Sequence, residues 1–196
     1  MEIILIRHGL PEHVDHGDGA DSADPALTAE GLDQANRLAR WFERQQIHTV
    51  ISSPMRRARQ TAAPLAAAFG LEIEEHPGVV EFDKDSKDYI PAEKMKELDY
   101  ERWQGYTSGR YGEGVDFNAF ADTVVESIEG IIAANRGRRV AVVCHGGVIN
   151  VWTARVLGFD PRMFFVPGYT SVNRYMAASS GERTLVSLNE TAHLPV

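Results

Sequence analysis

The sequence contains very little cysteine, with Cys144 as the single example among 196 residues. A chain with one cysteine cannot form an intramolecular disulfide, so a reducing compartment is favoured and a cytoplasmic enzyme is the expectation. Long apolar runs are also lacking, and none approaches the length that spans a membrane. The amino terminus has an acid at Glu2, a short apolar run and then charge, unlike a secretory signal peptide. We therefore expect no membrane partner.

Basic charge is scarce as well: 20 lysines and arginines stand against 28 aspartates and glutamates, which gives a formal net charge of −8. No nucleic-acid partner is expected for so acidic a chain, because nucleic acids bind to basic surfaces. A local cluster of arginines would instead mark a site within an acidic protein. The 43% hydrophobic and 24% charged residues are typical of a globular protein, and the length predicts one domain over residues 1–196.

The first apolar run, residues 3–6, is too short for a helix and is rich in β-branched side chains. It predicts a strand that is buried on both faces, as in a parallel sheet. Arg7, His8 and Gly9 follow directly, at the carboxyl end of the strand, where open α/β sheets bind their ligands. A guanidinium beside an imidazole suits an anionic, oxygen-rich ligand. The alternative for these three residues is a salt bridge, a helix cap and a turn.

A second apolar run repeats this pattern far along the chain. Residues 139–144 predict another fully buried strand, which is followed by His145, Gly146 and Gly147 and then by an apolar helix over residues 148–157. Backbone N–H groups at the start of such a helix can bind an anion. We therefore expect His8 and His145 to meet at the same edge of the sheet, around one anion.

Strands and helices alternate along most of the chain, which predicts an α/β fold with a mostly parallel sheet. Residues 83–116 break the alternation and are predicted to be an insertion over the sheet, either a lid or an inert surface loop. This insertion has a short helix near residues 92–98 and a glycine-rich stretch without P-loop spacing. The other predicted elements are helices over residues 28–46, 55–69 and 117–135, strands over residues 48–52 and 71–75, and a hairpin of residues 171–177 and 183–188.

The helix predicted over residues 55–69 has three arginines in its first turn, Arg56, Arg57 and Arg59. The helix dipole disfavours cations at an amino terminus, so this placement indicates a functional role for at least one of them. The alternative for Arg56 and Arg59 is a basic helix face exposed to solvent, because at most one of the three arginines needs to face the ligand.

Two rival chemistries have weak support in the residue spacing. His13 and His16 lie in a turn-rich loop after His8, but no cysteine and no regular histidine spacing accompanies them, so no metal site is expected. Cysteine-dependent phosphatases place an arginine six residues after the nucleophile, whereas Asn150 occupies that position after Cys144. Cys144 is therefore expected to be an inert, buried side chain.

Four segments of the chain together resemble the histidine phosphatase superfamily, the phosphoglycerate-mutase-like proteins, in its branch of small cytoplasmic members. The segments are residues 5–9, 24–31 with Gln34 and Ala35, 52–62, and 143–149, and they follow the order and spacing of the family. The resemblance covers nearly the whole chain. It implies a three-layer α/β/α sandwich of the phosphoglycerate mutase type with a mostly parallel central sheet.

The resemblance also implies roles for the residues at the two strand ends. His8 would be the nucleophile that forms a phosphohistidine, and His145 would complete the pocket. The family's arginine in the helix motif directly precedes an alanine, which selects Arg57. No metal and no cofactor are required, because guanidinium and imidazole groups neutralise the phosphate. The implied contacts to a small phosphorylated substrate are Arg7, Arg57, His145, Gly146 and Gly9.

An acid must also protonate the leaving oxygen and later activate water. Glu81 follows a strand and a turn at about the distance expected for the family, and its apolar neighbours would raise its pKa. Glu97 is the competing candidate, because residues 97–105 partly match a family signature, although Glu101 replaces its usual glycine. Glu97 lies inside a predicted helix, so Glu81 is the expected general acid and base.

The departures from the family pattern favour a phosphatase of small metabolites, a phosphoric monoester hydrolase. Mutases of the family usually follow Arg-His-Gly with Glu and, shortly after, Trp-Asn, whereas Leu10 and Pro11 follow here. A phosphoglycerate mutase remains the alternative enzyme. An inactive phospho-ligand-binding module is the alternative of another class, although such a module would be expected to have lost His8, Arg57 or His145. The physiological ester and the oligomeric state stay open, and a homodimer is one option.

Overall fold

A six-stranded sheet forms the centre of the protein in the computed structural model, which describes residues 1–15, 22–109, 111 and 115–195. The strand order is β4-β3-β6-β1-β7-β8. The first four strands in this order are parallel to one another, and β7 is antiparallel to both β1 and β8. The bounds are β1 Glu2–Arg7, β3 Thr49–Ser52, β4 Ile73–Glu75, β6 Arg139–Cys144, β7 Val172–Ala177 and β8 Arg183–Glu190.

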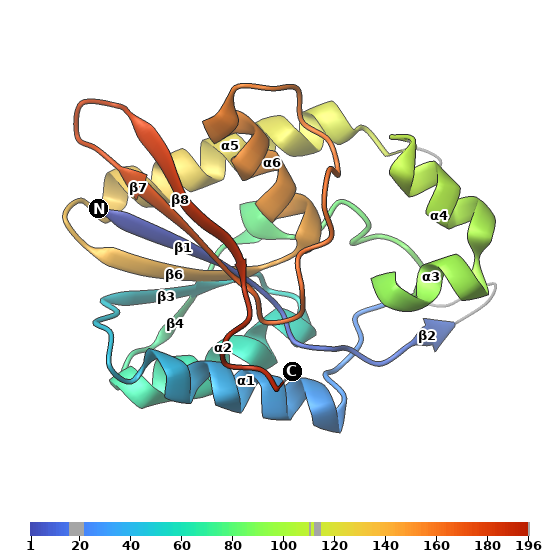
Figure 1. Cartoon of the computed structure of the whole chain (residues 1–196), viewed down its shortest axis with the longest axis horizontal. Coiled ribbons are helices and arrows are strands. Elements are labelled where there is room, and N and C mark those ends of the chain that lie inside the picture. Colours follow the sequence, from blue (N-terminus) through green and yellow to red (C-terminus); the bar gives the residue numbers. More distant parts are fainter. Residues whose placement is uncertain (16–21, 110, 112–114, 196) are drawn as a thin grey trace.

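Helices cover both faces of this sheet (Figure 1). Helices α1 (Ala29–Phe42) and α2 (Arg56–Phe69) lie on one face, and α5 (Phe117–Ala134) and α6 (Gly146–Leu157) lie on the other. The predicted three-layer α/β/α fold with a mostly parallel sheet is therefore confirmed. The predicted closing hairpin is confirmed as well, because β7 and β8 pair with each other at the edge of the sheet.

The unbroken apolar run in β1 has a direct structural reason. Successive strand side chains point to opposite faces, and both faces of β1 are covered by helices. Ile3 and Leu5 belong to the hydrophobic cluster beneath α5 and α6, whereas Ile4 and Ile6 belong to the cluster beneath α1 and α2. All four side chains are fully buried. A polar residue at any of these positions would lie in one of the two cores.

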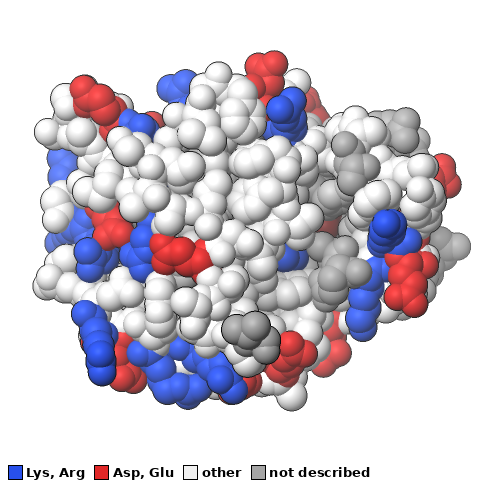
Figure 2. Space-filling view, in the orientation of Figure 1, with Lys and Arg blue, Asp and Glu red and all other residues white. Residues whose placement is uncertain are grey.

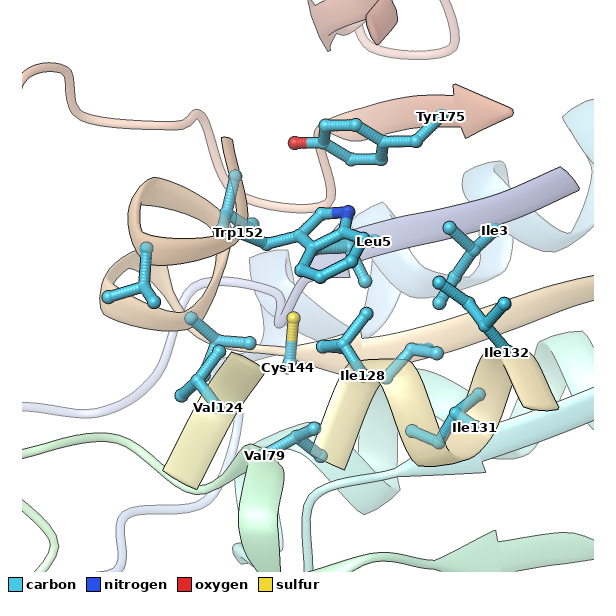
Figure 3. Close-up of a cluster of buried hydrophobic side chains, with 14 of the residues drawn as sticks. Ile3, Leu5, Val79, Val124, Ile128, Ile131, Ile132, Cys144, Trp152 and Tyr175 are labelled. Atoms are coloured by element: carbon cyan, nitrogen blue, oxygen red, sulfur yellow. The ribbon is translucent and has the colours of Figure 1, made fainter. Parts of the chain in front are cut away.

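The core on the α5 and α6 side joins residues that lie far apart in the sequence (Figure 3). Figure 3 shows Ile128 of α5, Trp152 of α6 and Leu5 of β1 around a common space, with the Cys144 sulfur close by. These side chains are fully buried. The cluster therefore fixes the two helices and the strands β1 and β6 relative to one another.

The helix ends differ slightly from the predicted ones. Helix α1 begins after Thr28, whose Oγ1 accepts a hydrogen bond from the Gly31 N–H at 2.9 Å, and it ends at Phe42, four residues earlier than predicted. Helix α6 begins at Gly146, two residues before its predicted start, with His145 as its N-cap residue. The first N–H groups of a helix have no partner within it, so those of Gly146 and Gly147 are directed toward groups outside the helix near the sheet edge.

Residues 83–116 form more secondary structure than predicted. Besides the expected helix α3 (Ala92–Leu98), they contain a second helix, α4 (Tyr100–Thr107), which includes the first glycine of the glycine-rich stretch. They also contain β5 (Asp88–Tyr89), which pairs with β2 (Val14–Asp15) in what was predicted to be a loop. A short 3-10 helix, η1 (Pro77–Val79), leads into the segment. Figure 1 shows α3 and α4 beyond the carboxyl ends of the parallel strands.

Charged side chains of both signs are distributed over the surface. Figure 2 shows them mainly around the margin of this face, with uncharged atoms across much of its centre. Within the described part of the chain, no helix has both the length and the hydrophobicity needed to cross a membrane.

We expect Ile128→Ala to lower the free energy of unfolding by about 2–5 kcal/mol, because it leaves a cavity in the core under α5. Urea denaturation followed by circular dichroism measures this change. Val186→Ala is the control: Val186 is 55% exposed on β8, and its truncation should change stability by no more than about 0.5 kcal/mol. Equal effects of the two substitutions would contradict the described core.

Candidate active site

The parallel pairing of β1 with β6 brings the two histidines together. In this pairing Arg7 lies opposite Cys144, and the next residue on each strand is a histidine. The backbone N–H of His8 donates to the Cys144 carbonyl at 3.0 Å, which extends the pairing beyond the strands. The imidazole centroids of His8 and His145 are 5.2 Å apart. Both rings can therefore contact a single small ligand.

His8 is buried and its ring orientation is fixed by the backbone. Its Nδ1 lies 2.8 Å from the Gly9 carbonyl oxygen, which can only accept, so we assign the proton to Nδ1. The lone pair of Nε2 is then available for a bond to a ligand. Burial, reinforced by the charges on Arg57 and Arg7, lowers the pKa of His8 well below its ordinary value. The ring is accordingly neutral and nucleophilic at neutral pH.

Gly9 is also held in place, through its own N–H. This group donates to Thr61 Oγ1 at 2.9 Å, and the Thr61 hydroxyl donates to the Arg57 carbonyl at 2.8 Å. The hydrogen bonds link the turn after β1 to the first turns of α2. Any shift of α2 would therefore move the residues that follow β1.

Arg7 is the first of two buried guanidinium groups in the site. Its Nη1 donates to the Pro167 carbonyl at 2.6 Å, and its Cζ lies 4.0 Å from the centre of the Tyr169 ring. The Tyr169 ring also lies 5.8 Å from the ring of His8. The loop before β7 thus supports both residues that follow the apolar part of β1.

Arg57 is the second guanidinium, and it is 1% exposed at the start of α2. Its Cζ lies 4.7 Å from the centre of the Tyr89 ring, and its Nη1 lies 3.8 Å from Asp24 Oδ1. Among the described residues, none accepts a hydrogen bond from Arg57 Nε or Nη1. Buried donors of this kind are expected to bind an anion, because leaving them unsatisfied is costly.

The other two arginines of this turn point away from the site. Arg56 and Arg59 are exposed, and Arg59 forms an ion pair of 3.4 Å with Glu75. The N-cap residue of α2, Met55, has no side-chain hydrogen bond to the helix. Asp24 caps the helix instead, because its carboxylate accepts a hydrogen bond from the Arg56 N–H at 2.9 Å. The negative charge of Asp24 also offsets the unfavourable placement of cations at this helix end.

His145, the N-cap residue of α6, is fully buried. Its Nε2 lies 2.8 Å from Ser53 Oγ, and Ser53 Oγ accepts the Met55 N–H at 3.3 Å. We therefore assign the Ser53 hydroxyl as the donor to Nε2, which leaves the proton on Nδ1. No described residue is hydrogen-bonded to Nδ1, so this N–H is available to a ligand.

The surroundings of His145 determine its charge in the ligand-free site. Burial, followed by the positive charges of Arg57 and Arg7, lowers the pKa of His145 well below its ordinary value. The imidazole is therefore neutral before a ligand binds, and it acts as a hydrogen-bond donor instead of a cation. The two arginines supply the positive charge of the site.

Glu81 is 8% exposed, and both oxygens of its carboxyl group are held by backbone N–H groups. Gly147 donates to Oε2 at 2.9 Å and Phe82 donates to Oε1 at 3.1 Å. Burial, and next the charge of Asp83, raises the pKa of Glu81 to about 7, although these two hydrogen bonds and Arg57 act in the opposite direction. At neutral pH this carboxyl group can both give and take a proton.

The competing acid, Glu97, does not lie in this arrangement. It is an exposed residue in α3, and it does not line the cavity that contains His8 and Glu81. Its position follows from the helical pattern, which places Met95 inside and its neighbours Lys96 and Glu97 in solvent.

A cavity of about 190 Å³ is lined by all of the predicted catalytic groups except His145, which lies behind it next to His8 and Gly146. Arg7, His8, Arg57, Glu81 and Gly146 line one half of it. This half combines two guanidinium groups, a neutral nucleophile and a carboxyl group with a pKa near neutrality. Such a set can bind a phosphoryl group, attack it and exchange a proton with it.

A larger hollow of about 1010 Å³ lies next to this cavity and shares Asp83 and Tyr106 with it. Its lining includes several further carboxylates and one arginine, Arg102, which is paired with Asp88 at 2.8 Å. An acidic lining disfavours phosphorylated ligands, so the smaller cavity is the candidate active site.

Several supporting residues were not predicted from the sequence. Ser53 and Thr61 lie inside a family-like segment without having been singled out, and Tyr169 lies outside every segment considered. Gly147 was expected to bind an anion, whereas its N–H is occupied by Glu81. The position of Gly147 beside a histidine at a helix start indicated a functional role. It did not indicate that this role would be to hold Glu81.

The rival chemistries have no structural support within the described residues. Cys144 is fully buried in the core, and burial raises the pKa of its thiol. No group of three or more potential metal ligands is found in the described chain. His13 is exposed, and His16 lies outside the described residues.

Comparison with known proteins gives the family. The sequence model of the histidine phosphatase superfamily, branch 1, matches residues 3–191. The chain belongs to this superfamily. Its relatives include a probable phosphoglycerate mutase from Serratia proteamaculans, which is 29% identical over 81% of this chain and 75% of that protein.

A second relative of this histidine phosphatase is phosphoserine phosphatase 1 from Hydrogenobacter thermophilus, 26% identical over 99% of this chain and 94% of that protein. Among solved structures, a phosphoserine phosphatase from Entamoeba histolytica has a TM-score of 0.78 at 23% identity, with 99% of each chain covered. The family relationship and the phosphatase relatives support a small-metabolite phosphatase, and the structural match supports the fold.

We expect Gly147→Ala to disturb the site and to lower stability by about 1–3 kcal/mol, because the added methyl group meets an occupied position. A Cβ at residue 147 would lie 2.1 Å from Glu81 Oε1 and 2.8 Å from Phe82 Cδ1. Urea denaturation measures the loss. Gly130→Ala in α5 is the matched control, because its Cβ would have no neighbour within 4 Å; it should be neutral or slightly stabilising. A neutral Gly147→Ala would contradict the placement of Glu81.

Proposed function

We propose that this histidine phosphatase hydrolyses phosphomonoesters of small metabolites through a phosphohistidine on His8, without a metal. One observation carries the proposal: a neutral imidazole with a free Nε2 shares a small cavity with two buried guanidinium groups and with Glu81. The positive charges of the two arginines stabilise the negative charge on the phosphoryl oxygens, a role that a metal ion has in other phosphatases. The substrate-binding groups are Arg7, Arg57, the Nδ1–H of His145 and the backbone at Gly146; Gly9 contributes indirectly, because its N–H is used by Thr61 and its carbonyl holds His8.

In the first step the phosphoryl group binds to the two arginines and to His145, and His8 Nε2 attacks phosphorus. The bond from phosphorus to the leaving oxygen breaks as the new phosphorus–nitrogen bond forms. Glu81, which is partly protonated at neutral pH, gives its proton to the leaving oxygen. The alcohol is then released and the phosphoryl group stays on His8.

In the second step Glu81 acts as a base. Its carboxylate takes a proton from a water molecule, whose oxygen attacks phosphorus as the bond to His8 breaks. Inorganic phosphate leaves, and His8 and Glu81 return to their starting states. The raised pKa of Glu81 suits both roles, because neither protonation state is strongly favoured near pH 7.

The alternatives have less support. A phosphoglycerate mutase is among the relatives, but the phosphoserine phosphatase relative covers 99% of this chain against 81% for the mutase. An inactive binding module does not need a nucleophile with a free nitrogen beside a carboxyl group with a raised pKa. The proposal extends to a cytoplasmic location, to one domain over residues 1–196 and to residues 83–116 as an insertion that contributes to the site.

We expect His8→Ala to reduce phosphate release by at least about a thousandfold, because no other nucleophile is in place. Glu81→Gln should reduce it by about 100-fold to 10,000-fold, the usual range for one acid–base group, while inorganic phosphate still binds. Assays of kcat with a phosphomonoester, and calorimetric titration with phosphate, measure both effects. Glu97→Gln is the matched control and should behave like the wild type. If Glu97→Gln destroys turnover and Glu81→Gln does not, the acid assignment is wrong.

We expect kcat/KM to fall as pH rises through about 7, because the leaving oxygen needs the protonated form of Glu81. Asp83→Asn should move this alkaline limb to lower pH, since it removes a negative charge that raises the pKa of Glu81. Asp85→Asn is the control, because the Asp85 side chain is 84% exposed and pairs with Lys84. An unchanged limb in Asp83→Asn, or an equal shift in both variants, would contradict this assignment.

A further inference from the structure

The second half of the active-site cavity differs in character from the half that would hold phosphate. Apart from Asp83 and the hydroxyl groups of Tyr89 and Tyr106, the lining beyond the phosphoryl half is apolar or aromatic: Ile90, Met95, Trp103, Met163, Phe164, Phe165, Val166 and Pro167. These residues come from the segment after β5, from α3 and α4, and from the loop between α6 and β7. Because the leaving group of a bound phosphomonoester extends away from the two arginines, this half is where it would lie.

No lysine, arginine or histidine is found among the described residues that line this half. The nearby Arg102 is already paired with Asp88. Lys96 is exposed, and although its Nζ lies 4.9 Å from the centre of the Trp103 ring, it does not line the cavity. A carboxylate on the leaving group would therefore lose its hydration without gaining a positive partner, which is unfavourable.

Among the described residues that line the cavity beyond the phosphoryl half, the charged one, Asp83, has the wrong sign for an anionic substrate. Asp83 lines the cavity together with Glu81, and its charge is close enough to raise the pKa of Glu81. A second negative charge on the substrate would meet this carboxyl group in a setting of low dielectric. The two arginines cannot compensate, because the phosphoryl group already takes up their charge.

The size of the cavity limits the leaving group further. Its volume of about 190 Å³ must hold the phosphoryl group and the part of the alcohol next to it. An apolar protein cavity of about 150 Å³ accepts benzene, so one ring or a short branched chain fits here, with its outer end at the rim. Val166 marks that rim, because it is 65% exposed.

We infer that the substrate is a phosphomonoester of a compact, apolar alcohol without an anionic group, and that carboxylated esters such as phosphoserine and phosphoglycerate are poor substrates. This inference rests on the proposed phosphatase function. It concerns the lining of the leaving-group half and leaves the groups around phosphate as proposed above.

The test compares two esters that differ by one remote carboxylate, benzyl phosphate and 4-carboxybenzyl phosphate, with phosphoserine as a third substrate. We expect kcat/KM for benzyl phosphate to be at least about tenfold higher than for either carboxylated ester, the size of effect that follows from burying one uncompensated charged group. An equal or inverted preference would overturn the inference.

Two variants with the same substitution test where the discrimination arises. Val166→Lys places a cation at the rim and should raise kcat/KM for 4-carboxybenzyl phosphate severalfold relative to benzyl phosphate. Val186→Lys, at a similarly exposed valine on β8, should leave the ratio unchanged. If Val186→Lys has the same effect as Val166→Lys, the discrimination is a matter of overall charge and the inference is wrong.

The same assays separate this inference from the proposed function. If no ester releases phosphate, or if His8→Ala releases it as fast as the wild type, the phosphatase proposal fails. If phosphate is released through His8 but the carboxylated esters are preferred, the phosphatase proposal stands and the inference fails. Lys96→Met is made for that last outcome. If the wild type prefers carboxylated esters and Lys96→Met does not, Lys96 supplies a positive charge to the leaving group and the inference is wrong.

Discussion

The parallel pairing between β1 and β6 is the constraint on which the site depends. It sets Arg7 opposite Cys144, and each strand continues into a histidine, so the two imidazoles emerge side by side. A shift of this register by one residue would turn the buried side chains of β1 toward the wrong face. The two hydrophobic cores therefore hold the register, and through it they hold the distance between His8 and His145.

Burial decides the protonation states of the groups that this pairing assembles. It favours the neutral form of every titratable group in the site, lowering the pKa of both histidines and raising that of Glu81. The two arginines stay charged, because a guanidinium does not lose its proton in proteins. The result is a positive site with a neutral imidazole at His8 and a carboxyl group close to its midpoint, a combination that suits the proposed phosphoryl transfer to His8.

The two halves of the cavity are lined by different structural elements. The phosphoryl half is built from the ends of β1 and β6 and the start of α2, which are parts of the rigid sandwich. The leaving-group half is built from residues 83–116 and the loop before β7, which lie outside the sheet. Members of one superfamily can thus share the first half and differ in the second, because the lining of the second half does not affect the sheet.

The sequence by itself determined the α/β class, the two buried strands and the residues that follow them, because unbroken apolar runs and glycine-containing strand ends are local patterns. It also ranked Arg57 above its neighbours through the family resemblance, and Glu81 above Glu97 through that resemblance together with the apolar neighbours of Glu81 and the helical setting of Glu97. The tertiary structure alone decided that Gly147 holds Glu81, that His145 is neutral, and that the leaving-group half is mostly apolar. These features depend on contacts between residues far apart in the chain, and no local pattern encodes which distant side chains will share a cavity.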